Sequence, residues 1–163
     1  TLDRSSAASD VYKRQVCDAA PDVLAHNIET VERLQTAVRD RRSGFKRSLG
    51  VLSRANAHHL SPHTKSSIML GLGEREDEIV AAMKALRQHG VDFLTLGQYL
   101  QPTPGHFPVQ EYVHPTTFDA HREKGEALGF HYVASGPLVR SSYRAGEHFI
   151  RASIDSRKAD PNE

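Results

Sequence analysis

Residues 65–72 read KSSIMLGL, a stretch that is almost continuously apolar after its first three residues. An apolar run of this length is typical of a strand that is buried on both faces of a parallel sheet. Four acidic residues follow between positions 74 and 78, where the dipole of a starting helix favours negative charge. Apolar residues then recur at helical spacing, at Ile79, Val80, Met83 and Leu86. The stretch therefore predicts a buried strand followed by a helix that ends at Gly90.

The same alternation extends toward the amino terminus. Residues 22–26 (DVLAH) form a short apolar run that predicts a strand. Asn27 follows as a suitable N-cap, because its side-chain oxygen can accept a hydrogen bond from the first helical turn. The helix predicted after it carries Ile28, Val31, Leu34 and Val38 at helical spacing, and a second helix is predicted around Phe45, Leu49 and Leu52.

Toward the carboxyl terminus, residues 91–96 (VDFLTL) predict a third strand, and a loop rich in Pro and Gly follows. A helix is expected to begin near Pro115 and to end at Gly129, before a fourth strand at residues 131–135 (HYVAS). Strands that alternate with helices are the pattern of parallel βα units. A full eight-unit barrel needs roughly 200 residues or more, so we expect an α/β fold of partial (β/α) barrel type that resembles the C-terminal half of a barrel.

Composition restricts the possible classes of protein. The chain has 163 residues, a formal net charge of +1, 38% hydrophobic residues and 25% charged residues. This balance argues against broad phosphate neutralisation on nucleic acid, and the sequence has no apolar run of the roughly 18 residues that a membrane span needs. One cysteine, Cys17, excludes a disulfide framework within the chain, and with no visible secretory signal we expect a reducing, cytoplasmic location. Residues 1–15 are interpreted as a non-native or disordered leader, and residues 16–163 as one incomplete domain.

In folds of parallel βα units, chemistry gathers where the strands end. Gly71 and Gly73 either permit a tight turn or allow a ligand to approach the backbone, and Glu74 either pairs with a helix dipole or contacts a ligand. Polar side chains follow the third strand at residues 98–102 (QYLQP), and hydroxyl groups flank Arg140 in residues 136–143 (GPLVRSSY). Taken singly, each of these signals has an ordinary structural explanation.

Taken together and in order, the motifs resemble the C-terminal half of the lipoyl synthase family. The motifs are PDVLAHNIETV (21–31), TKSSIMLGLGE (64–74), LTLGQYLQP (94–102), EYVHPTTFD (111–119), EKGEALGF (123–130) and VASGPLVRSSY (133–143). The resemblance implies a radical S-adenosylmethionine enzyme that inserts two sulfur atoms, at carbons 6 and 8, into a protein-bound octanoyl group. It implies two four-iron, four-sulfur clusters and S-adenosylmethionine as cofactors. The implied partners are an octanoylated lipoyl carrier domain or glycine cleavage H protein, and a reductant such as flavodoxin or ferredoxin.

The resemblance also implies roles for individual residues. Ser142, the second serine of RSSY, matches the position whose oxygen binds an iron of the sulfur-donating cluster. Arg140 beside it either stabilises negative charge or orients the loop. The remaining implied contacts are to S-adenosylmethionine, from Asn27, Met69, Gly71, Glu74, Gln98, Tyr99 and Leu100. Position 67 departs from the family's GxIxGxxE motif, since Ser67 replaces the first glycine.

A larger departure concerns cysteine. The CxxxCxxC motif and the further cysteine trio that hold the two clusters are missing, and one thiolate cannot hold a four-iron cluster. We therefore predict that this polypeptide alone binds neither cluster stably, lacks turnover and, as half a barrel, has marginal solubility. Two other functions stay open: a non-catalytic binding module that uses the basic residues between 33 and 54, or a different βα-barrel enzyme. The latter would need a catalytic lysine at a strand end, whereas Lys65 lies at a strand start.

Overall fold

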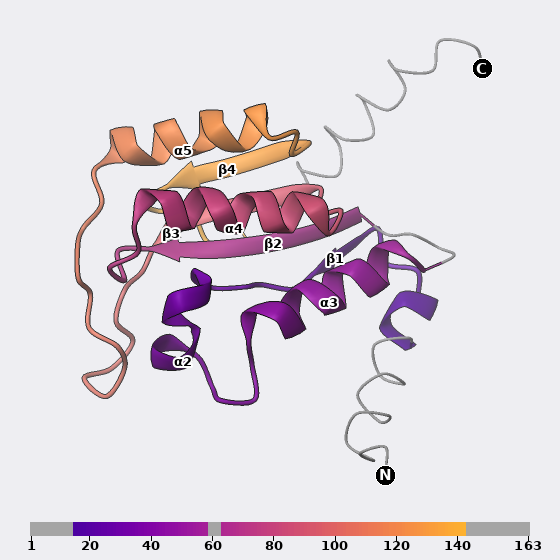
Figure 1. Ribbon diagram of the computed structural model, residues 1–163, viewed down its shortest axis with the longest axis horizontal. Coiled ribbons are helices and arrows are strands. Elements are labelled where there is room, and N and C mark those ends of the chain that lie inside the picture. Colours follow the sequence, from indigo (N-terminus) through magenta and orange to yellow (C-terminus); the bar gives the residue numbers. More distant parts are fainter. Residues whose placement is uncertain (1–14, 59–62, 143–163) are drawn as a thin grey trace.

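The computed structural model describes residues 15–58 and 63–142, which form an α/β structure around one four-stranded parallel sheet (Figure 1). The strands lie in chain order, so each pairs with the next along the sequence. They are β1 (Val23–Ala25), β2 (His63–Leu70), β3 (Phe93–Gln98) and β4 (Tyr132–Gly136). This architecture confirms the predicted partial (β/α) fold.

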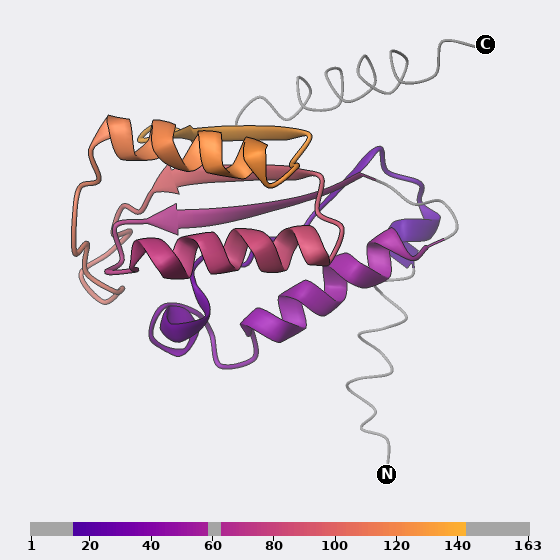
Figure 2. The same cartoon turned by 45° about the horizontal axis from the view of Figure 1, so that its top comes forward.

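Helices connect the strands and cover one face of the sheet, as Figure 2 shows. They are α3 (Phe45–Asn56), α4 (Glu76–Gln88) and α5 (Pro115–Ala127). The side chains of Ile68, Leu70, Leu94, Leu96 and Val133 alternate along the strands and pack in one core with apolar residues of these helices. The apolar side chains that recur along the sequence therefore form the contact that packs the helices on this face.

The opposite face of the sheet has no helix over it in the described part of the chain. Instead, the segment that follows β4 folds back across β2 and β3. The ammonium group of Lys65 donates a 2.6 Å hydrogen bond to the Ser141 carbonyl, and a Cβ atom at Gly97 would collide with the carbonyl oxygen of Val139. Lys65 is only 3% exposed, and burial lowers the pKa of its ammonium group. The prediction that β2 is buried on both faces is confirmed, although a chain segment covers the second face.

The prediction of a helix that starts directly after Asn27 is wrong. The chain instead continues irregularly to a 3-10 turn, η1 (Glu32–Leu34), and one turn of helix, α2 (Gln35–Val38). The Gln35 side chain explains the change, because it donates hydrogen bonds to the carbonyls of Ile28 and Thr30 and so closes a bend. The Asn27 side chain donates to Glu29 rather than capping a helix.

The other predicted elements are found close to where they were expected. Strand β3 begins at Phe93 and ends at Gln98, two residues later than predicted, and β4 begins at Tyr132. Gly90 and Gly129 end their helices with φ of +77° and +88°. Of the predicted leader, residues 1–14 lie outside the described residues, and residues 15–18 are helical. Within the described ranges, no helix is both long and apolar enough to cross a membrane.

Candidate functional site

A hollow of about 190 Å³ lies on the helix-free face, near the carboxyl ends of the strands. It brings together residues that are far apart in the sequence. They are Asn27 and Glu29 after β1, Ser67 and Met69 of β2, Gly97, Gln98 and Leu100 at the end of β3, and Val139, Arg140 and Ser141 after β4. Four of the eight predicted site residues, Asn27, Met69, Gln98 and Leu100, therefore line one hollow.

The polar groups at the hollow differ in charge. The amide nitrogen of Asn27 donates a 3.1 Å hydrogen bond to the carboxylate of Glu29. The guanidinium group of Arg140 donates to the carbonyls of Pro137 and Val139, at 3.2 and 2.8 Å. An anionic residue, a cationic residue and Met69 thus line one small space. This combination suits a ligand that carries opposite charges together with apolar surface.

Gly71 and Glu74 build the turn that follows β2 beside this hollow. The carboxylate of Glu74 accepts hydrogen bonds from the backbone nitrogens of Gly71 and Leu72, at 2.6 and 2.8 Å. Gly71 has a φ of +96°, and a Cβ atom there would collide with the Glu111 carbonyl. The carboxylate of Glu74 therefore closes this turn from within.

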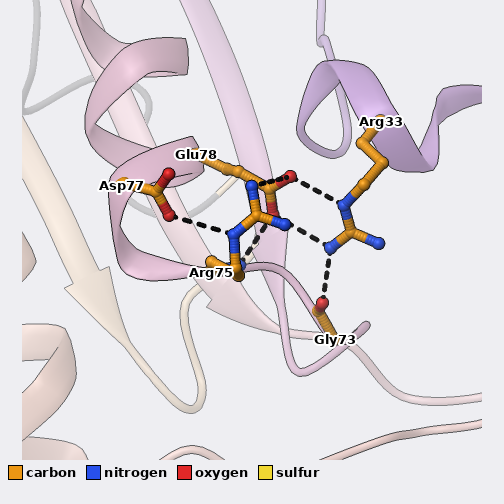
Figure 3. A network of polar contacts seen from close by, with 5 residues as sticks. All are labelled: Arg33, Gly73, Arg75, Asp77 and Glu78. Atoms are coloured by element: carbon orange, nitrogen blue, oxygen red, sulfur yellow. Dashed lines mark hydrogen bonds and ion pairs between the residues drawn. The ribbon is translucent and has the colours of Figure 1, made fainter.

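An arginine holds the same turn from outside, as Figure 3 shows. Arg33 forms two hydrogen bonds to the carboxylate of Glu78, at 2.7 and 2.9 Å, and a third to the Gly73 carbonyl at 2.8 Å. The Glu78 carboxylate also accepts from the backbone nitrogen of Arg75, whose side chain reaches Asp77. The Arg33 side chain, followed by the Arg75 backbone, lowers the pKa of Glu78 to about 2. The turn after β2 is thus fixed to η1 and to the first turn of α4.

Gln98 and Tyr99 place their polar groups in the long loop between β3 and α5. The amide of Gln98 donates to the carbonyls of Tyr99 and Glu111 and accepts from the backbone nitrogen of Val113. The hydroxyl of Tyr99 donates a 2.7 Å hydrogen bond to the Phe107 carbonyl. Both side chains are buried, whereas Leu100 is 52% exposed. Gln98 and Tyr99 therefore stabilise the loop that borders the hollow.

Ser142 is exposed and lies next to the hollow, one residue beyond Ser141. Tyr143, the last residue of the RSSY motif, lies outside the described residues.

Cys17 is buried and lines a separate hollow with Leu24 and His26. Burial, followed by the charge of Asp18, raises the pKa of its thiol. In the described ranges, Ser142 offers one exposed oxygen and Cys17 offers one buried thiol that lines another hollow. These two donors are insufficient to bind a four-iron cluster.

Sequence reasoning missed Glu29, which occupies the hollow through an uncommon backbone conformation. Its φ is +65°, and its backbone pairs with β2 through a hydrogen bond to the Ser67 carbonyl and another from the Met69 nitrogen. Neither apolar periodicity nor a motif indicates such a bridge. The residue lies two positions after Asn27 and within the motif at residues 21–31, and these were the available signals.

Comparison with known proteins extends these observations. The chain is 58% identical over 144 residues to a lipoyl synthase of Anaeromyxobacter dehalogenans, an alignment that covers 88% of this chain and 49% of the relative. It is 51% identical over 145 residues to an apicoplast lipoyl synthase of Plasmodium knowlesi, covering 89% of this chain and 33% of the relative. Over this shared stretch, the chain is similar in sequence to lipoyl synthases.

The match concerns the C-terminal part of these lipoyl synthases. A mitochondrial lipoyl synthase of Schistosoma mansoni is 54% identical over 154 residues, covering 88% of this chain and 37% of the relative. The chain thus spans half or less of the length of the curated relatives that it matches here. No protein-family model matches the chain.

The expected cytoplasmic location is wrong. Relatives from Plasmodium knowlesi, Ricinus communis and Schistosoma mansoni are named as apicoplast, chloroplastic and mitochondrial proteins, although bacterial lipoyl synthases also match. The physical reason is that the single-cysteine composition reports a reducing environment, and the interior of an organelle can provide one as well as the cytosol can.

Proposed function

We propose that this chain forms the C-terminal wall of a lipoyl synthase, an enzyme that inserts two sulfur atoms into a protein-bound octanoyl group. The observation that carries the proposal is the hollow at the strand ends, where residues of separate family-like motifs, Glu29 and Arg140 among them, lie together. The family similarity over nearly nine-tenths of the chain supports it. The expected macromolecular partners are an octanoylated lipoyl carrier protein and a small electron-transfer protein.

S-adenosylmethionine is the ligand proposed for the hollow. When it is bound and reductively cleaved, it supplies the radical that removes hydrogen from an unactivated carbon. Its charged amino acid group and the flat aromatic face of its adenine match the mixed lining, to which Asn27, Met69 and Leu100 contribute directly. Gly71, Glu74, Gln98 and Tyr99 are proposed to act by holding the turn and the loop that border the ligand. The hollow is smaller than the whole ligand needs, so the missing part of the enzyme must complete it.

Ser142 is proposed to bind one iron of the sulfur-donating cluster. Its exposure and its place beside the hollow are compatible with this role. A hydroxyl must lose its proton to bind iron well, and the charge of the metal makes this loss feasible. The same oxygen can be protonated again and released more readily than a thiolate when sulfur leaves. The cysteines for both clusters must come from outside this chain, so we propose that the chain alone has no turnover.

Two arginines of the basic stretch and the candidate catalytic lysine are engaged with other groups of this chain. In the basic stretch, Arg33 and Arg42 pair with carboxylates of the chain itself, Glu78 and Asp40. Lys65, the candidate for a catalytic lysine, donates its hydrogen bond to a backbone carbonyl beneath the segment that follows β4.

The test is a chimera that joins the front half of the Anaeromyxobacter dehalogenans lipoyl synthase to residues 16–163 of this chain. After anaerobic reconstitution with iron and sulfide, we expect the chimera to form 5′-deoxyadenosine and to convert an octanoylated carrier domain to its lipoyl form. The separate chain should do neither under the same conditions. A soluble chimera that carries both clusters yet makes no 5′-deoxyadenosine would contradict the proposal.

A further inference from the structure

Three ligand-type side chains meet at the opposite end of the sheet from the hollow. His63 begins β2, Asp92 immediately precedes β3, and His131 immediately precedes β4. One ligand atom from each lies within 4.8 Å of the other two. Because the strands are parallel and adjacent, their starts fall along one edge of the sheet and bring these residues together.

Two separations within this cluster, each to a different carboxylate oxygen of Asp92, are close to those between two ligands of one metal ion. His63 Nδ1 lies 3.4 Å from one carboxylate oxygen of Asp92, and His131 Nδ1 lies 3.6 Å from the other. These distances exceed those of ordinary hydrogen bonds to oxygen. Two ligands bound tetrahedrally to one zinc ion, at the usual zinc–nitrogen and zinc–oxygen lengths, are separated by roughly 3.4 Å.

The surrounding contacts hold the three groups in place. The backbone nitrogen of Thr64 donates a 2.8 Å hydrogen bond to the carboxylate of Asp92, the kind of outer contact that orients a metal-binding carboxylate. The ring of Phe93 lies 5.4 Å from the His63 ring and 6.4 Å from the His131 ring, measured between centroids. The His131 side chain is 50% exposed, so an ion and a completing water molecule can reach the cluster from solvent.

We propose that His63, Asp92 and His131 form a binding site for a divalent transition-metal ion of the zinc class. Two imidazoles and one carboxylate are ligands that zinc accepts, and water would complete the coordination. The ion would join the starts of three neighbouring strands and so stabilise the sheet at the end remote from the hollow. The site is independent of the sulfur-insertion function and of Cys17, which lines a hollow elsewhere.

The experiment is a Zn²⁺ titration of the full chain, produced without a histidine tag, freed of metal and competed against a chromogenic chelator. We expect one equivalent to bind with at least micromolar affinity and to raise the melting temperature. Asp92→Asn and His131→Gln should each weaken binding at least about tenfold. His106→Gln, in the exposed loop after β3, is the matched control and should bind as the unaltered chain does.

Folding is checked by circular dichroism. His131→Gln replaces a half-exposed side chain, so it gives a folded variant even if Asp92→Asn does not. Co²⁺ bound in place of Zn²⁺ should give a spectrum without sulfur-to-cobalt charge transfer, and Cys17→Ser should retain binding. Unchanged affinity in His131→Gln, an equal loss in His106→Gln, or loss of binding in Cys17→Ser would each overturn the proposal.

Discussion

At Gly71, the backbone turns out of β2 with a φ of +96°, in a region that side chains with a Cβ atom rarely adopt. A Cβ atom there would also meet the Glu111 carbonyl and the Gln98 amide. We therefore expect Gly71→Ala to lower the free energy of unfolding in urea by roughly 1–3 kcal/mol. Gly105→Ala is the control, because space is available there and the change should remain within about 0.5 kcal/mol. Equal effects of the two substitutions would refute this explanation of the turn.

Glu78 gives the turn a dependence on pH. Its pKa is lowered from 4.5 to about 2 by Arg33, so the unfolded chain binds a proton more readily than the folded chain between these values. The stabilising contribution is therefore fully present above about pH 4.5 and is lost as the pH falls toward 2. Between pH 5 and pH 3, the urea midpoint of the unaltered chain should fall more than that of Glu78→Gln. Glu123→Gln, at an exposed position of α5, should behave as the unaltered chain.

At the residue scale, the sequence correctly predicted features that depend only on the backbone conformation of a single residue. Gly90 and Gly129 have the positive φ expected of helix ends. It failed for Asn27, since the Gln35 side chain, eight positions later, determines how that segment bends. The two glycine positions could be predicted from local conformational preference. The bend after Asn27 could not, because it depends on hydrogen bonds from the Gln35 side chain to backbone carbonyls earlier in the chain.

At the scale of the elements, the conformation of the long loop between β3 and α5 depends on the side-chain amide of Gln98. Gln98→Met would leave the Val113 nitrogen and the Glu111 carbonyl without the partner they now have. We expect this change to lower the free energy of unfolding by about 1–3 kcal/mol and to increase proteolytic cleavage within residues 101–112. Tyr112→Phe, at a 75% exposed position of the same loop, should alter neither quantity appreciably. Equal protease resistance in the two variants would show that the amide does not hold the loop.

The elements themselves were largely predictable because their signals are local. Helix α4 combines acidic residues in its first turn with a buried apolar stripe, and α5 begins at Pro115 as expected. The segment that follows β4 could not be predicted to cover the sheet. Its position depends on the hydrogen bond from Lys65 and on the close approach at Gly97, and neither leaves a periodic pattern.

For the whole molecule, β1 and β4 are the outer strands of an open sheet within the described residues. Unpaired strand edges and exposed apolar side chains favour association. Leu138, in the segment that crosses the sheet, is 83% exposed. We expect sedimentation velocity to detect species larger than a monomer as concentration rises, and Leu138→Lys to reduce them. A chain that stays monomeric at every concentration and unfolds in one cooperative transition would contradict this expectation.

The candidate site was predictable in part at this scale. Parallel βα topology predicted that residues after successive strands converge, and Asn27 and Gln98 do line one hollow. Met69 and Leu100, which line it too, were named through the family resemblance. The cluster of His63, Asp92 and His131 at the other end follows from the same topology, because the starts of neighbouring parallel strands also lie along one edge of the sheet. Glu29 depends on an unusual backbone bridge, so it required the structure.

The most direct test of the central claim is the partition of products when Ser142→Ala is introduced into the lipoyl synthase chimera. If Ser142 binds iron of the sulfur-donating cluster, 5′-deoxyadenosine should still form while the lipoyl product is lost. Ser141→Ala should retain both products, because the substitution leaves the backbone carbonyl of residue 141 and its hydrogen bond from Lys65 in place. Full sulfur insertion by Ser142→Ala, with an unchanged iron content, would contradict the account.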